Sequence, residues 1–146
     1  MPQSSNIIIL YDRIKELSRT ESTGPMVLDG AATGFSSFGS AYPHSGLMYY
    51  AITDGVQYEI GSGQYEQAGQ VGADETVVSS NQIRRYPFRS TNSNVAVNWT
   101  AGTKEVYVTY PAPQSVYTGS GVSPHFNTPV SSGIPYWESA NILNYD

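Results

Sequence analysis

Short runs in which apolar and polar side chains alternate dominate the middle of this 146-residue chain. In residues 95–100 and 106–110, for example, every second residue is a large apolar one. Alternation with a period of two places one face of a β-strand inward and the other outward. The pattern predicts strands near residues 11–18, 25–29, 47–54, 56–61, 75–80, 95–100 and 104–110.

Three of these runs allow a more detailed expectation. Residues 11–18 also fit a helix, because two of their apolar residues are three apart, but we favour a strand. Residues 47–53 are apolar on both faces, which indicates a central strand or one covered by another chain. In residues 56–61 we expect Val56, Tyr58 and Ile60 to face inward, with Glu59 on the polar face.

Turn-forming residues separate the runs and complete the fold prediction. Asp54-Gly55 and Ala101-Gly102-Thr103 lie between neighbouring strands, where hairpins need glycine. Only 13% of the residues are charged, whereas the chain has 12 Tyr, 14 Gly and 9 Pro, a composition that argues against long helices and against a disordered chain. Residues 33–41 fit one helical turn. We predict an all-β fold, an antiparallel sandwich or barrel of about seven short strands with an extended C-terminal arm.

The C-terminal arm differs from the rest of the chain. Residues 106–137 contain no Asp, Glu, Lys or Arg, and five prolines interrupt any regular strand pairing. We therefore divide the chain into an N-terminal segment (1–10), a β domain (11–112) and a Pro/Gly/Tyr-rich arm (113–146). Large apolar side chains in an extended arm need a surface to cover them, either the arm's own domain or a neighbouring subunit. The candidate interface residues of the arm are Tyr117, Phe126, Tyr136 and Trp137.

One basic cluster interrupts this weakly charged sequence. Arg84, Arg85 and Arg89 lie within six residues and are interleaved with Tyr86 and Phe88. The cluster is compatible with stacking on single-stranded nucleic acid, with docking on an acidic neighbour, or with a solvated loop. Because the net charge is −5, we do not expect general nucleic-acid binding, and we take the three arginines as candidate interface residues.

The sequence predicts no catalytic residue, metal site or cofactor. Without cysteine there is no disulfide or thiolate ligand, and His44 and His125 lack a second ligand at helical spacing. The carboxylates Asp54, Glu59 and Glu66 could pair for glycoside cleavage, but we interpret the first two as a turn residue and a surface residue. Gly61-Ser62-Gly63 lacks the residues of a phosphate loop and fits a β-bulge or a tight bend.

The sequence also predicts no membrane contact and no export. Its longest apolar run is far shorter than a membrane span. The four apolar residues 7–10 have no basic residue before them, so we do not interpret them as a secretion signal.

Several segments, taken in order, resemble a β-rich domain of tailed-bacteriophage structural proteins, often found near the start of tail-fibre or related virion proteins. The resemblance covers roughly residues 11–112. It implies no catalytic residues, and it favours anchoring or connecting over receptor recognition because a fibre would continue into a shaft beyond Asp146. The matching segments are residues 11–16 (YDRIKE), 34–38 (GFSSF), 50–55 (YAITDG), 58–65 (YEIGSGQY), 76–81 (TVVSSN) and 97–107 (VNWTAGTKEVY).

The functional expectation is therefore a non-enzymatic virion protein of a tailed phage. It would be made in the host cytoplasm and would anchor or connect tail or fibre components. We expect a homo-oligomer, with a trimer favoured, in contact with other virion proteins of the tail, adaptor or capsid. Two alternatives stay open: a head decoration (cement) protein that clamps capsid subunits, and a carbohydrate-binding module in which exposed aromatic rings stack on sugars.

Overall fold

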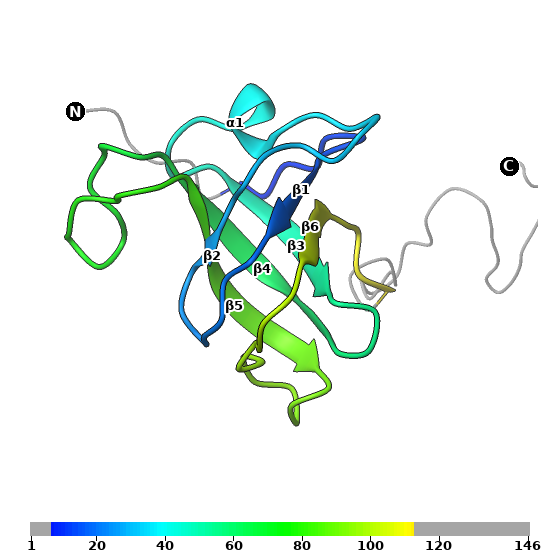
Figure 1. Ribbon diagram of the computed structural model, residues 1–146. Helices are drawn as coiled ribbons and strands as arrows, with labels where there is room; N and C mark the ends of the chain where they lie inside the picture. Colours follow the sequence, from blue (N-terminus) through cyan, green and yellow to red (C-terminus); the bar gives the residue numbers. More distant parts are fainter. Residues whose placement is uncertain (1–6, 113–146) are drawn as a thin grey trace, which may run out of the picture. The chain divides into compact units, whose positions relative to one another are not determined.

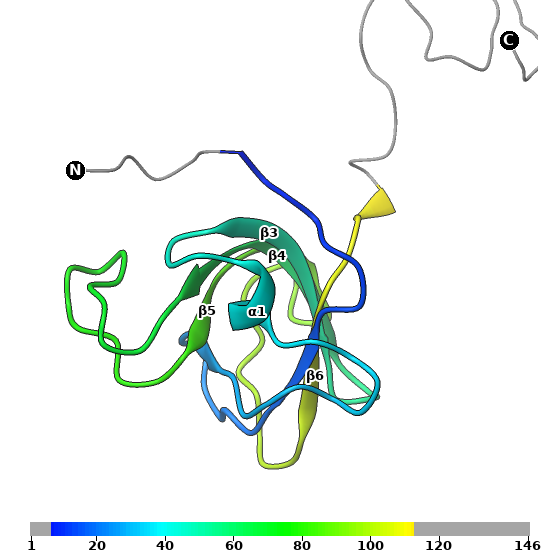
Figure 2. The ribbon, with the colours of Figure 1, turned by 90° about the horizontal axis from the view of Figure 1, so that it is seen from above.

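The computed structural model describes residues 7–112, which form one antiparallel sheet and one short helix. The sheet order is β1-β6-β3-β4-β5-β2, and its strongly curved strands surround an interior that α1 overlies (Figures 1 and 2). The elements are β1 (Lys15–Ser18), β2 (Met26–Val27), α1 (Phe38–Ala41), β3 (Leu47–Thr53), β4 (Tyr58–Glu66), β5 (Gln82–Ser90) and β6 (Lys104–Val108).

A single short segment nearly closes this sheet into a barrel. Met26 and Val27 of β2 pair with Ile83 and Gln82 of β5. A few residues later, the N–H of Asp29 donates to the carbonyl of Leu17 in β1 (2.8 Å). Residues 26–31 therefore connect the two ends of the sheet, which removes most of the exposed strand edge.

The interior combines an apolar core with a bound carboxylate beneath α1. Phe38, Met48, Ile52 and Val106 are fully buried. Glu16 of β1 accepts a hydrogen bond from the N–H of Phe38 (2.8 Å), where α1 begins. This bond satisfies a backbone donor that has no partner inside the helix, and it fixes the Phe38 ring over the core.

The structure confirms the all-β antiparallel prediction and several of its details. Residues 11–18 contain a strand rather than a helix, and β3 is central, between β6 and β4. The expected helical turn in residues 33–41 is α1. The turn at Asp54-Gly55 joins the paired strands β3 and β4. Gly102 has a φ of +119°, but the hairpin expected there does not form, because residues 95–100 join no ladder.

Two expected strands are wrong, and one strand was not expected, so the described residues contain six strands instead of seven. Residues 75–80 belong to the long connection between β4 and β5, where Glu75 adopts a φ of +68°. Residues 95–100 bury Val97 and Trp99 alternately but join no ladder, because the N–H of Val97 donates to a side chain, that of Glu59. The unexpected strand is β5, which contains the arginine cluster.

The expected orientation of β4 is also wrong. Val56 is 88% exposed, Tyr58 is 37% exposed, and Glu59 is completely buried. The inward positions that follow Glu59 are occupied by two glycines, Gly61 and Gly63, which explains why the apolar side chains of this alternation face outward. A Cβ on Gly63 would lie 2.8 Å from the Tyr50 ring and 2.9 Å from Ile83, so this inward position has no room for a side chain. The expected bulge is confirmed by a shift in register between Ile60 and Gly61.

Replacing Gly61 by Ala should destabilise the barrel at this bulge. The added Cβ would lie 2.4 Å from the carbonyl oxygen of Tyr86 and 2.6 Å from the Cα of Pro87, and neither backbone atom can move alone. We expect Gly61→Ala to lower the free energy of unfolding by about 1–3 kcal/mol in urea denaturation. Ser62→Ala, at the next and half-buried position, is the matched control. Equal stability of the two variants would contradict the packing described for Gly61.

Candidate functional site

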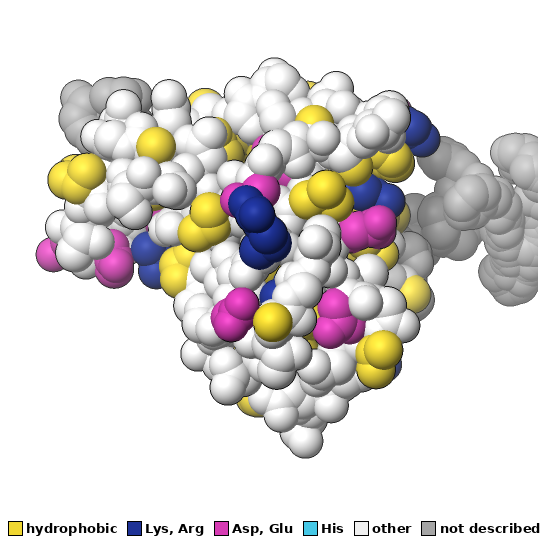
Figure 3. Space-filling model, viewed as in Figure 1, with side chains coloured by type: hydrophobic (Ala, Val, Ile, Leu, Met, Phe, Trp, Pro, Cys, Tyr) yellow, Lys and Arg dark blue, Asp and Glu magenta, His cyan; other side chains and the backbone are white. Residues whose placement is uncertain are grey.

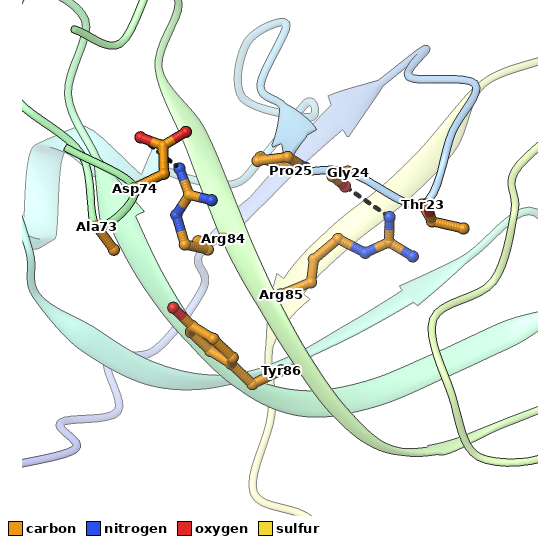
Figure 4. Close-up of a pocket in the computed structure, with 8 residues that line it drawn as sticks. All are labelled: Thr23, Gly24, Pro25, Ala73, Asp74, Arg84, Arg85 and Tyr86. Atoms are coloured by element: carbon orange, nitrogen blue, oxygen red, sulfur yellow. Dashed lines mark hydrogen bonds and ion pairs between the residues drawn. The ribbon is translucent and has the colours of Figure 1, made fainter. Parts of the chain in front are cut away.

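The arginine cluster lies in strand β5, where the sequence predicted no strand, so it does not form a solvated loop. Side chains of adjacent residues in a strand point to opposite faces. Arg84 and Tyr86 accordingly lie on one side of β5, and Arg85 lies on the other, inside the barrel (Figure 4). The structure thereby separates two arginines that are neighbours in the sequence and gives them different surroundings.

Arg85 and Glu59 form a buried ion pair between β5 and β4. Two guanidinium nitrogens donate to the two carboxylate oxygens of Glu59, at 2.9 and 2.5 Å. The side chains are 1% and 0% exposed. Arg85 also donates to the carbonyls of Ser22 (3.2 Å), Gly24 (2.6 Å) and Val97 (2.9 Å), so its remaining hydrogens have partners among the neighbouring segments.

Tyr50 of β3 completes this buried network. Its hydroxyl donates to Glu59 (2.6 Å), and the N–H of Val97 donates to the other carboxylate oxygen (2.8 Å). Burial, followed by the negative charge of Glu59, raises the pKa of Tyr50 far above its ordinary value. The phenol therefore stays protonated and serves as a hydrogen-bond donor to the carboxylate.

Glu66, at the end of β4, forms a second buried ion pair with Arg84. Two guanidinium nitrogens donate to its carboxylate oxygens, at 2.8 and 3.0 Å. The N–H of Ala73 (2.7 Å) and the amide of Gln82 (2.7 Å) donate to the same carboxylate. Burial raises the pKa of Glu66, but these donors outweigh burial and hold the pKa below its ordinary value.

A shallow groove of about 290 Å³ lies between these two ion pairs (Figure 4). The segment before β2 and residues of β5 line it, together with Ala73 and Asp74 from the β4–β5 connection. Asp74 lies 3.6 Å from the Arg84 guanidinium, and the hydroxyl and N–H of Thr76 lower the pKa of this carboxyl. Asp74, Arg84 and Arg85, which line the groove, are thus already paired with other groups of the domain. This arrangement is suited to holding the β4–β5 connection in place.

The groove residues do not combine into a proton-transfer or metal-binding arrangement. Within residues 7–112, no group of three His, Asp or Glu side chains is placed to hold a metal ion. Asp54 accepts hydrogen bonds from the N–H groups of Val56 and Gln57, as expected of a turn residue. The expected surface position of Glu59 is wrong, because this carboxylate is the buried partner of Arg85.

Two of the sequence segments that carry the phage resemblance contact each other. The N–H of Ser36 donates to the carbonyl of Arg13 (2.7 Å), and the N–H of Lys15 donates to the carbonyl of Ser36 (3.2 Å). The Arg13 guanidinium donates to the carbonyl of Gly34 and lies 4.0 Å from the centre of the Phe35 ring. These contacts give the segments a structural role: they attach the loop before α1 to the start of β1.

The candidate interface residues lie in different environments, and some of them lie outside the described residues. Arg84 and Arg85 bind carboxylates of their own domain, so neither presents an unpaired guanidinium. Arg89 is exposed, and its interface role stays a prediction. His44 bridges two segments, since its ring accepts from the N–H of Gln67 and contacts the carbonyl of Val71. His125 and the arm candidates Tyr117, Phe126, Tyr136 and Trp137 lie outside the described residues.

Tyr86 and Phe88 are the outward-facing aromatic residues of β5. In the sequence they attract attention only because they are interleaved with the arginines. The extra residue of the bulge in β5 is Phe88, since Pro87 pairs with Gly61 and Arg89 with Ile60. Tyr86 is 48% exposed and Phe88 39% exposed, and the Phe88 ring lies 6.3 Å from that of Tyr49, across β4. A bulge changes the direction of side chains only where the strand pairs with its partner. The local alternation of the sequence therefore cannot predict that change.

Breaking the Arg85–Glu59 pair from one side should strongly destabilise the barrel. Arg85→Met leaves the Glu59 carboxylate buried without its cation, and we expect the free energy of unfolding to fall by about 3–5 kcal/mol in urea denaturation. Arg19→Met is the matched control, because its side chain is 75% exposed and we expect a change within about 0.5 kcal/mol. A small loss in Arg85→Met would show that the pair is dispensable for stability.

The lowered pKa of Glu66 predicts an acid-sensitive contribution to stability. A carboxyl whose pKa is lower in the folded state stabilises the fold above its unfolded pKa, and this contribution is lost as the pH falls through the folded pKa. We expect Glu66→Gln to be less stable at neutral pH and to lose less further stability in acid than the original chain. Free energies of unfolding measured across the acid range test this, with Glu21→Gln, an exposed carboxylate, as control. Parallel pH profiles for Glu66→Gln and the original chain would contradict it.

Comparison with known proteins supplies no relative from which a role could be transferred. No family model, curated protein or solved structure matches this chain. Among residues 7–112, no helix is long and apolar enough to cross a membrane. The functional interpretation therefore depends on the chain's own residues, and above all on which charged groups are buried and which apolar groups are exposed.

Proposed function

We propose that this chain is a non-enzymatic structural protein of a tailed-phage virion, which anchors or connects tail or fibre components. The β domain associates with copies of itself, with a trimer favoured, and with other virion proteins. Its antiparallel fold is compatible with the β-rich domain that residues 11–112 resemble. The contact between residues 11–16 and 34–38 supports the same proposal, because it gives two of the resembling segments a shared structural purpose.

The observation that carries the proposal is the contrast between the interior and the outer surface of the barrel. The buried residues include Glu59, Glu66, Arg85 and Lys104, each with hydrogen-bond partners inside the domain. On the face shown in Figure 3, charged side chains form small separate groups among uncharged surface. Exposed large apolar side chains of the domain include Tyr58, Tyr86, Phe88, Val56, Val71, Val77 and Val95.

Such a surface is suited to association between proteins. Aromatic side chains supply a large contact area for few rotatable bonds, and they are enriched at interfaces. A low density of surface charge also reduces repulsion between copies that each carry a net charge of −5. These properties suit a protein whose task is to bind its neighbours in a particle.

Two alternatives use the same surface differently. A head decoration protein would apply it to capsid subunits, and nothing in residues 7–112 favours the tail over the head. A carbohydrate-binding module would stack sugars on the exposed rings of Tyr86 and Phe88, which is the observation that favours this alternative.

Purified particles of the phage that encodes the chain test the proposal. We expect antibodies against the β domain to label intact particles at the tail, and a stained gel to show tens of copies or fewer per particle. Hundreds of copies on the head would favour the decoration alternative. Absence of the chain from particles, together with glycan binding that Tyr86→Ser abolishes, would replace the proposal by the carbohydrate-binding alternative.

A further inference from the structure

The connection between β4 and β5 forms a projecting loop with an apolar tip, which we call the knob loop (residues 67–81; the green loop at the left of Figure 1). Val71 and Val77 pair with each other across it and are 57% and 68% exposed. Several internal hydrogen bonds fix its shape, among them those from Gly72 N–H to the Thr76 carbonyl and from Ala73 N–H to Glu66. The knob loop therefore presents its two valines in a defined position.

The knob loop also carries a carboxylate that has no ion pair within the described residues 7–112. Its two acidic residues differ, because Asp74 lies beside Arg84, whereas Glu75 is exposed and forms no ion pair with any residue of 7–112. The knob loop thus combines a small apolar area with a single unneutralised negative charge.

From its middle to its last residues, β5 carries a surface of complementary character, which we call the β5 end (Tyr86, Phe88 and Arg89). Its two rings are partly exposed, and the bulge places Phe88 and Arg89 on the outer face together. Arg89 is exposed and forms no ion pair within the described part of the chain. The β5 end therefore combines an apolar area with a single unneutralised positive charge.

Tyr86 lines the groove beside Asp74 of its own knob loop, but Phe88 and Arg89 lie too far along β5 to contact the knob loop of the same domain. The knob loop precedes Gln82, where β5 begins, and Arg89 lies seven residues further along the strand. At about 3.3 Å per residue, the two ends of β5 are roughly 23 Å apart. Figure 1 shows the knob loop and the Ser90 end of β5 at opposite ends of the sheet.

We propose that the knob loop of one copy docks on the β5 end of the next, with Val71 and Val77 against Tyr86 and Phe88 and with Glu75 facing Arg89. This inference rests on the proposed function and specifies how the copies associate. The contact joins two different surfaces, so it is heterologous and leaves one of each surface unused on a pair of copies. A heterologous contact closes into a ring when its rotation permits, which is compatible with the favoured trimer.

Reversal of the two charges in the full chain tests the contact, with mass in solution measured by sedimentation equilibrium at low and moderate salt. We expect Arg89→Glu and Glu75→Arg each to raise the dissociation constant by about tenfold or more, because each places like charges together. The double variant, which exchanges the charges, should restore most of the association. Val77→Ser should weaken it as well, through loss of the apolar contact.

Matched controls separate this contact from general effects of charge and hydrophobicity. Glu21→Arg changes the net charge as Glu75→Arg does, at an exposed site outside the contact, and Val56→Ser removes an 88% exposed valine. Both should leave the mass unchanged. An oligomer that survives the single reversals would overturn the proposed contact but not the virion function, which labelling of particles tests separately. A monomeric original chain would also overturn the contact, as would a double variant no better than the single ones.

Discussion

The buried carboxylate of Glu59 is the constraint on which the rest of the barrel depends. A carboxylate removed from water needs a cation and several hydrogen-bond donors, and here they come from three parts of the chain. Arg85 supplies the cation, Tyr50 and the N–H of Val97 supply donors, and the same guanidinium reaches the carbonyls of Ser22 and Gly24. One charged group thereby fixes β3, β4, β5 and two segments without regular structure relative to one another.

This interior determines what the surface can do. Arg84 and Arg85 are both paired inside the domain. Of the basic cluster, Arg89 on the outer face of β5 therefore remains without an ion pair among residues 7–112. In the second pair, Glu66 binds Arg84 and also accepts from the N–H of Ala73, which lies between the two valines of the knob loop in the sequence. The pair therefore holds the knob loop against the barrel. The charges of the two ion pairs therefore stabilise the fold, whereas the exposed apolar groups are left to contact other proteins.

The errors of the sequence analysis have a common physical origin. Alternation identified the strand at 56–61, but apolar residues were assumed to face inward, whereas Glu59, Gly61 and Gly63 do so. No strand was predicted at residues 82–90, and a solvated loop was one of the interpretations of the arginine cluster, since charged residues usually lie at the surface. Pairing of Arg85 with Glu59 depends on residues 26 positions apart, and no local pattern reports such a distant partner. The sequence therefore singled out the segment that contains the arginines, but not the buried environment of Arg85.

The sequence by itself determined the fold class, the central position of β3 and the turn at Asp54-Gly55 between β3 and β4. Alternation and turn chemistry are local properties, so they can be recognised before any partner strand is known. Only the tertiary structure decided which face of β4 is buried, which arginines are neutralised, and where Val77, Phe88 and Arg89 are presented. These outcomes depend on register and on contacts between distant segments, because the environment of a charge is set by whichever groups the folded chain places beside it.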